Sequence, residues 1–270
     1  MSKAPGSVWI TGASQGIGRA LALELAGRGA RVAVSARGAG ALTELALQSH
    51  ALTSEPLDVT DAAAIAATVT RIEATQGPLD LVVLNAGIYQ PLPGGLAVPE
   101  VFAEHMAVNY QGVVNGLCAV LPRMRERRQG QVAIVASVAG YRGLPQAAAY
   151  GPTKAALINL AETLRLELRG SGVDLRLVNP GFVATRLTAQ NRFTMPSLLT
   201  PEDAARRILA GLAGRRFEIA FPLGFVTWMR LLRLLPYGLY FPLVARLTGR
   251  PDQAGPVPPP KPIRRNPGTS

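Results

Sequence analysis

The 270-residue chain has few of the residues from which proteins build disulfides and metal sites. It contains one cysteine, Cys118, and two histidines, His50 and His105. A single cysteine excludes an internal disulfide framework and a cysteine-based zinc site, and the two histidines stand far apart in the sequence. We therefore expect no bound metal, and we expect the protein to work in a reducing compartment.

Long apolar runs are also lacking. The charge-free runs near the C-terminus, residues 219–229 and 234–245, are shorter than the roughly 20 residues that cross a bilayer. The first residues lead directly into an apolar strand, without the pattern of a signal peptide. The sequence predicts a cytoplasmic protein, with a peripheral contact to a membrane as the alternative.

Acidic residues are scarce towards the C-terminus. The net charge is +11, and residues 215–270 account for +7 of it, with nine basic and two acidic side chains. The remaining body has the charge of an ordinary soluble domain, so no nucleic-acid binding is expected. The basic end is either a solvated surface or a contact with an anionic membrane.

Lysine is rare: there are three lysines against 25 arginines, and only Lys154 lies away from the chain ends. It follows Tyr150 by four residues, and residues four apart share one face of a helix. A neighbouring ammonium favours the phenolate, so the pair predicts a tyrosine with a lowered pKa that works in acid–base chemistry. The alternative is a chance pair on a solvated helix. Pro152 requires this helix to begin near Tyr150.

Apolar strands alternate with helix-length segments along the first 222 residues. We expect strands at residues 8–10, 31–35, 51–57, 79–84, 131–136, 173–178 and 217–221. Helices are expected at 17–28, 40–48, from 61 onward, and at 99–128, 148–169 and 200–213. Continuously apolar strands separated by helices indicate an α/β fold, a single Rossmann-type doubly wound parallel sheet with helices on both faces. Ligands bind such sheets at the carboxyl ends of the strands.

The first strand ends in a glycine-rich turn, residues 11–18, with the sequence Thr-Gly-Ala-Ser-Gln-Gly-Ile-Gly. Glycines let the backbone approach a pyrophosphate, and the N-terminus of the following helix supplies free N–H groups. The turn lies between a strand and a helix in the first βα unit, where dinucleotides bind. Its expected cofactor contacts are Gly12, Ser14, Gln15, Gly16, Ile17 and Gly18.

The end of the second strand indicates which dinucleotide binds. An acidic residue there would accept hydrogen bonds from a free ribose 2′-hydroxyl, but the chain has Ser35, Ala36 and Arg37 and no acid before Glu44. A cation at this place favours a 2′-phosphate, so Arg37 predicts NADP(H) over NAD(H). The alternative is that Arg37 is a solvated loop residue.

These segments together resemble the short-chain dehydrogenase/reductase family over about residues 5–222. The resemblance implies a catalytic tetrad at Asn109, Ser137, Tyr150 and Lys154. It also implies cofactor contacts beyond the glycine turn. These are Asp58 and Val59 at the adenine, Asn85, Ala86 and Gly87 after a strand, Tyr150 and Lys154, and Pro180, Gly181, Val183 and Thr185 over the nicotinamide.

The roles of the tetrad follow from hydride transfer to a carbonyl, which leaves charge on oxygen. Tyr150 is expected to donate the proton, Lys154 to lower the phenol's pKa and hold the nicotinamide ribose, and Ser137 to hydrogen-bond the substrate oxygen. The family resemblance implies that Asn109 holds a water linking Lys154 to solvent. Taken outside this set, Ser137 and Asn109 would be a turn serine and a solvated helix residue.

The predicted function is therefore that of an NADP(H)-dependent oxidoreductase acting on a carbonyl or alcohol. The alternative is a catalytically idle NADP-binding sensor or scaffold. A homodimer or homotetramer is expected. The residues that favour a hydrophobic substrate are Leu144, Phe182, Leu187, Phe193 and Met195.

Two segments follow the predicted catalytic domain of residues 1–222. Residues 223–248 are apolar with interspersed arginines, and residues 249–270 form a basic, proline-rich tail that we expect to lack regular structure. In the apolar segment, Phe225, Trp228, Met229, Leu232 and Leu235 fall on one helical stripe. Three interpretations remain: a lid over the substrate cleft, a subunit interface, or a helix on a membrane surface.

Overall fold

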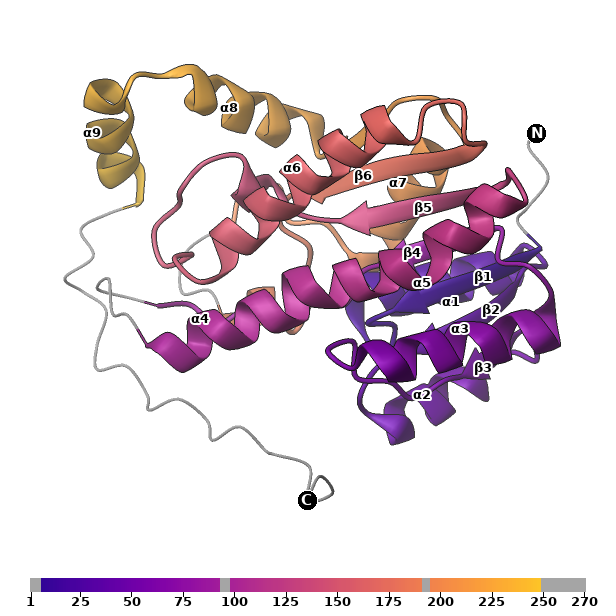
Figure 1. Ribbon diagram of the computed structural model, residues 1–270. Coiled ribbons are helices and arrows are strands. Elements are labelled where there is room, and N and C mark those ends of the chain that lie inside the picture. The colour runs from indigo at the N-terminus through magenta and orange to yellow at the C-terminus, as the bar shows by residue number, and fades with distance from the viewer. Residues whose placement is uncertain (1–5, 93–97, 191–194, 249–270) are drawn as a thin grey trace.

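A computed structural model describes residues 6–92, 98–190 and 195–248, and its centre is a seven-stranded parallel sheet (Figure 1). The strand order is β3-β2-β1-β4-β5-β6-β7. The strands are β1 (Ser7–Thr11), β2 (Arg31–Ser35), β3 (Leu52–Ser54), β4 (Leu81–Leu84), β5 (Gly130–Val135), β6 (Val173–Pro180) and β7 (Glu218–Phe221). The strand order reverses between β1 and β4, where doubly wound sheets bind their ligands. The predicted fold class is confirmed.

Helices cover both faces of the sheet, and β1 shows how the strands divide their side chains between them. Trp9 packs into the cluster under α3 (Ala62–Gln76), α5 (Gly112–Glu126) and α6 (Tyr150–Glu167). Its neighbours Val8 and Ile10 pack on the opposite face. That face is covered by α1 (Gly16–Gly27), α2 (Ala39–Ala46) and α7 (Pro201–Leu212). Both clusters are apolar, which explains the continuously apolar strands.

The long helix predicted at residues 99–128 is instead built in three parts. It comprises α4 (Pro99–His105), a π-helical segment η2 (Met106–Gln111) and α5. A π-turn holds an extra residue, and such turns occur frequently at functional sites. Here the π-helical segment contains Asn109, which is fully buried. The strand predicted at 51–57 is also shorter, because only Leu52–Ser54 pair with β2.

The C-terminal helix pair, α8 (Leu223–Leu234) and α9 (Tyr237–Thr248), extends beyond β7 on the side to which β5 points (Figure 1). Of the predicted stripe, Met229 and Leu232 are buried in the same cluster as α6. Phe225 and Leu235 are partly buried, and Trp228 is 42% exposed. The stripe therefore packs largely inward. None of the helices in the described parts of the chain has the length and hydropathy to cross a bilayer.

Arg142 attaches the C-terminal helix pair to the rest of the fold. Arg142, which follows the short helix η3 (Val138–Gly140), donates to the backbone carbonyls of Leu232, Arg233 and Leu235 at 2.6–2.8 Å. Its guanidinium lies 3.9 Å from the centroid of the Tyr240 ring. A cation over an aromatic face is attracted to it. Arg142 thus binds the end of α8 and the start of α9 together.

Candidate active site

A cavity of about 2240 Å³ opens at the carboxyl ends of the strands. That volume exceeds the usual range for one small ligand and leaves room for a dinucleotide beside a substrate. All the predicted catalytic and cofactor residues line it except Gly18 and Asn109. The remaining walls come from the loop after β6 and from α8 and α9. Residues distant in sequence are thus brought to one site.

The glycine turn is held tightly against the loop after β4. Gly12 has φ +67°, and a Cβ there would lie 2.7 Å from the Ala86 Cα. The Asn85 amide donates to the carbonyls of Thr11 and Gly12, at 3.1 Å each. Thr11 Oγ1 in turn accepts from the backbone N–H groups of Asn85 and Ala86. Asn85, Ala86 and Gly12 therefore shape the turn as well as line the cavity.

The N-terminus of α1 suits an anion. Its N-cap residue, Gln15, makes no side-chain capping bond, and no acidic residue stands in the first turn. The N–H groups of this turn are therefore left for a ligand such as a phosphate. Gly18 allows the turn to close, because a Cβ at that position would lie 2.5 Å from the Gly12 carbonyl oxygen. Together these features fit the pyrophosphate of a dinucleotide.

The residues predicted at the adenosine end also lie at the cavity. Arg37 is exposed and lines its rim, and Asp58 and Val59 line it after β3. Asp58 accepts hydrogen bonds from the backbone and side chain of Thr60, which fix its carboxylate. Arg19, a neighbouring cation, donates instead to Gln48 at 3.0 Å.

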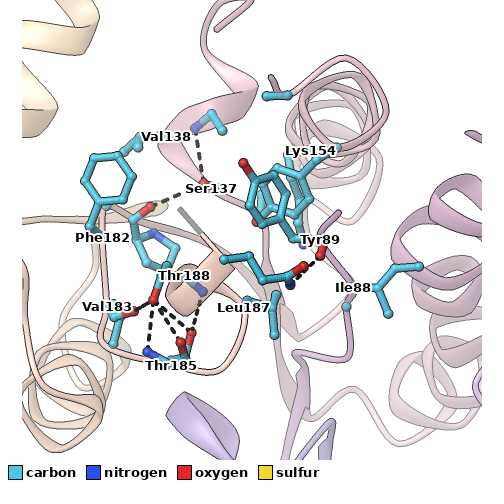
Figure 2. Close-up of a pocket in the computed structure, with 18 of the residues that line it drawn as sticks. Ile88, Tyr89, Ser137, Val138, Lys154, Phe182, Val183, Thr185, Leu187 and Thr188 are labelled. Atoms are coloured by element: carbon cyan, nitrogen blue, oxygen red, sulfur yellow. Dashed lines mark hydrogen bonds between the residues drawn. The ribbon is translucent and has the colours of Figure 1, made fainter. Parts of the chain in front are cut away.

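Tyr150 and Lys154 come from the first turns of α6, which begins at Tyr150, so Pro152 is tolerated there. Lys154 is only 3% exposed, and its Nζ donates to the Val135 carbonyl at 3.0 Å. It lies 5.6 Å from the centroid of the Tyr150 ring. Ser137, just after β5, is the third member of this group, and Figure 2 shows Ser137 and Lys154 beside the same part of the pocket.

Burial shifts both titrating groups away from their charged forms. It raises the pKa of Tyr150 to about 12, although a hydrogen bond with Ser137 acts in the opposite direction. Burial likewise lowers the pKa of Lys154 to about 8. In the protein without cofactor, burial has the largest influence on the pKa of the phenol, and the lowering of that pKa by Lys154 stays a prediction. The Lys154 ammonium is turned towards the Val135 carbonyl.

Asn109 holds the loop after β4. Its Oδ1 accepts from the Ile88 backbone N–H at 2.7 Å, and its Nδ2 donates to the Ile88 carbonyl at 3.0 Å and to Thr153 Oγ1 at 3.2 Å. A Cβ on Gly87 would lie 3.2 Å from the same Oδ1 and 3.6 Å from Lys154 Nζ. Asn109 therefore lies behind the cavity wall and positions the chain that passes Lys154.

Sequence reasoning missed several residues of the site. The Tyr89 ring meets the Tyr150 ring edge-on, with centroids 5.1 Å apart. On the opposite wall, Thr188 Oγ1 donates to the Val183 carbonyl and accepts from the Thr185 N–H, which fixes the loop after β6 (Figure 2). Tyr89 stands in the loop after β4, and no local sequence pattern marks either Tyr89 or Thr188 as a residue of the site.

The far end of the cavity is apolar. Among the residues predicted for it, Leu144, Phe182 and Leu187 line the cavity, whereas Met195 does not and Phe193 lies outside the described residues. The C-terminal helix pair adds apolar lining to this end, namely Phe225, Trp228, Met229, Leu232, Tyr240, Phe241, Val244, Ala245 and Leu247. Across the described ranges, no group of His, Cys, Asp and Glu side chains could hold a metal ion.

Known proteins are similar to this chain in sequence. Residues 7–195 match the short chain dehydrogenase family. The chain is 40% identical to an uncharacterized oxidoreductase of Myxococcus xanthus over 88% of this chain and 96% of that protein. It is 33% identical to the 2,3-dihydro-2,3-dihydroxybenzoate dehydrogenase of Escherichia coli over 81% of this chain and 82% of that protein.

A solved structure agrees with these relatives. The short chain dehydrogenase of Burkholderia cenocepacia, determined in complex with NADP, superposes with a TM-score of 0.78 at 26% identity. The match covers 92% of this chain and all of that one. The fold and the site thus define a nucleotide-binding oxidoreductase. The chain belongs to the short-chain dehydrogenase/reductase family.

Lys154 gives the fold a testable pH dependence. Its pKa is about 8 when folded and near its usual value when unfolded, so the unfolded chain binds more protons between these two values. Stability must then rise with pH in this window. Between about pH 7.5 and 9.5, the free energy of unfolding in urea is expected to increase by about 2 kcal/mol from this group. Lys154→Met should lose that increase, and an unchanged slope in the variant would contradict the assignment.

Proposed function

We propose that the protein is an NADP(H)-dependent reductase that converts hydrophobic ketones or aldehydes into alcohols. The observation that carries this proposal is the placement of Tyr150, Ser137 and Lys154 at one cavity with the glycine turn. The cofactor, when bound, supplies the hydride. A phenol and a hydroxyl beside a carbonyl oxygen are suited to protonate and stabilise the charge that develops there.

Each of the three side chains has a separate task. Tyr150 donates its phenolic proton to the substrate oxygen as negative charge forms on it. Ser137 donates a hydrogen bond to the same oxygen and so holds the carbonyl in place. Lys154 is mostly protonated at neutral pH and stabilises the phenolate that remains after proton transfer. Asn109 keeps the loop beside Lys154 in position through its bonds to Ile88.

Tyr150 carries at neutral pH the proton that carbonyl reduction requires. Because burial raises this pKa to about 12, the phenol keeps its proton at neutral pH and is ready to donate it.

The apolar end of the cavity supports a hydrophobic substrate. We expect kcat/KM for NADPH-dependent reduction to rise with chain length in a series of linear aldehydes and ketones, because each buried methylene contributes about 0.8 kcal/mol. The measurement is the loss of NADPH absorbance for each compound. Met229→Asp places a charge among the apolar residues of α8 and should reduce the dependence of kcat/KM on chain length. If kcat/KM of the parent protein does not depend on chain length, this substrate class is contradicted.

Arg37 supports NADPH as the cofactor, since it lies at the cavity rim where the adenosine ribose is expected. We expect the protein to bind NADPH at least ten-fold more tightly than NADH, and Arg37→Ala to reduce that ratio to near one, since charge-assisted bonds contribute about 1.5–3 kcal/mol. Isothermal titration with both cofactors measures the ratio. Arg31→Ala, at the opposite end of β2, is the matched control and should leave it unchanged. Equal affinities in the parent protein would refute the preference.

A further inference from the structure

The C-terminal helix pair carries most of the exposed apolar side chains of the described chain. Of the twelve large hydrophobic residues that are exposed in residues 6–92, 98–190 and 195–248, eight lie on these two helices. Soluble proteins rarely gather such residues in one place without a partner. Trp228, Phe241 and Leu247 line the cavity described above, whereas the other five, Leu223, Leu231, Leu234, Tyr237 and Leu239, lie outside it.

The helix α8 is apolar on two opposite faces. Val226, Met229 and Leu232 point into the fold, whereas Leu231 and Leu234 are 56% and 79% exposed. A helix on the surface of a soluble protein normally presents polar residues on the face away from the core. One face of α8 is covered by the protein itself, so the other face is left for an external partner.

The charges around this face are of one sign. Arg233 and Arg246 are exposed, and within the described chain neither has an ion pair. Arg230 is bound to Glu218, so that carboxylate is already neutralised. The sequence has no acidic residue from 219 to 251, and the basic residues Arg250, Lys261, Arg264 and Arg265 follow. The apolar face is therefore accompanied by unneutralised positive charge.

We propose that the outward face of α8 and α9 docks on the surface of an anionic lipid bilayer. Leucines and aromatic rings with flanking arginines are the composition of helices that lie in a membrane interface. A second copy of the chain fits the same face poorly. A two-fold interface would bring the face against itself, and no free carboxylate in residues 219–248 would be available to the arginines.

Sedimentation of the full chain with vesicles tests the proposal without cofactor or substrate, so the result is independent of the proposed function. The protein should bind vesicles of phosphatidylcholine with phosphatidylglycerol more tightly than vesicles of phosphatidylcholine alone, and salt should weaken the binding. Leu231→Glu with Leu234→Glu should weaken it at least ten-fold. Arg233→Gln with Arg246→Gln should weaken it about five-fold for each arginine on anionic vesicles.

Two control double variants replace residues of the same kinds elsewhere on the surface. Leu47→Glu with Leu166→Glu also replaces two exposed leucines, and Arg125→Gln with Arg169→Gln also removes two exposed arginines. Neither pair should change vesicle binding, and circular dichroism must show that all four double variants fold. The proposal is overturned if the parent does not bind anionic vesicles, or if both leucine pairs weaken binding equally. It is also overturned if the parent is a dimer that Leu231→Glu with Leu234→Glu dissociates and vesicles bind neither form.

Discussion

Replacing Tyr150 by phenylalanine is expected to lower kcat for carbonyl reduction by about three to four orders of magnitude, because general acid catalysis contributes up to about 10⁴-fold. The variant loses one oxygen atom and keeps the ring that packs against Tyr89. Cofactor affinity should therefore change little. Steady-state kinetics on the best carbonyl substrate and titration with NADPH give the two quantities separately.

Tyr110→Phe is the matched control, because Tyr110 is a partly buried tyrosine that does not line the cavity. It should keep full activity. If Tyr150→Phe turned over substrate at the parent rate, the assignment of the proton donor would be wrong. If the parent itself bound NADPH but reduced no compound in a broad panel of ketones and aldehydes, a sensor or scaffold would be the better interpretation.

Gly18→Ala is expected to weaken NADPH binding by about two orders of magnitude, which corresponds to about 3 kcal/mol. The new Cβ would lie 2.5 Å from the Gly12 carbonyl oxygen and 2.7 Å from the Asn85 side-chain nitrogen. Both atoms belong to the tightly bonded turn, so relief requires the turn itself to move. The same displacement should reduce the free energy of unfolding by about 1–3 kcal/mol.

Gly27→Ala is the control within the same helix. Gly27 ends α1, and a Cβ there would meet nothing within 4 Å. This variant should bind NADPH as the parent does and gain up to about 1 kcal/mol in stability, because alanine restricts the unfolded chain. Parent-like affinity in Gly18→Ala would show that the turn tolerates a side chain and does not shape the cofactor site.

The sequence predicts the sheet well because its signals are local. Helices were expected to begin at residues 61 and 200, and the structure has Asp61 and Thr200 there as N-caps. Their side chains accept from the backbone N–H groups of Ala64 and Asp203 respectively. Alternation of apolar strands with helices then determines the fold class. The π-helical segment around Asn109 escapes such reasoning, because one additional residue in a turn leaves the apolar pattern nearly unchanged.

The sequence predicts which residues form the site better than it predicts how their side chains are oriented. Spacing places Tyr150 and Lys154 on one helix face, but the direction of the ammonium depends on the Val135 carbonyl, which β5 supplies from elsewhere in the chain. The same limit applies to α8. Its helical period identifies residues that share a face, yet both faces are apolar, so the period alone does not reveal that Met229 turns inward and Leu231 outward.

The contacts that attach the C-terminal helix pair to the fold are distinct from the side chains with which this pair lines the cavity. Arg142 holds the pair through three main-chain oxygens and the rings of Tyr237 and Tyr240. Main-chain oxygens are present whatever the side chain, so residues such as Phe225 and Met229 can be exchanged without loosening that anchor. Laboratory evolution towards new substrates should therefore accumulate replacements on the inner side of α8 while retaining Arg142.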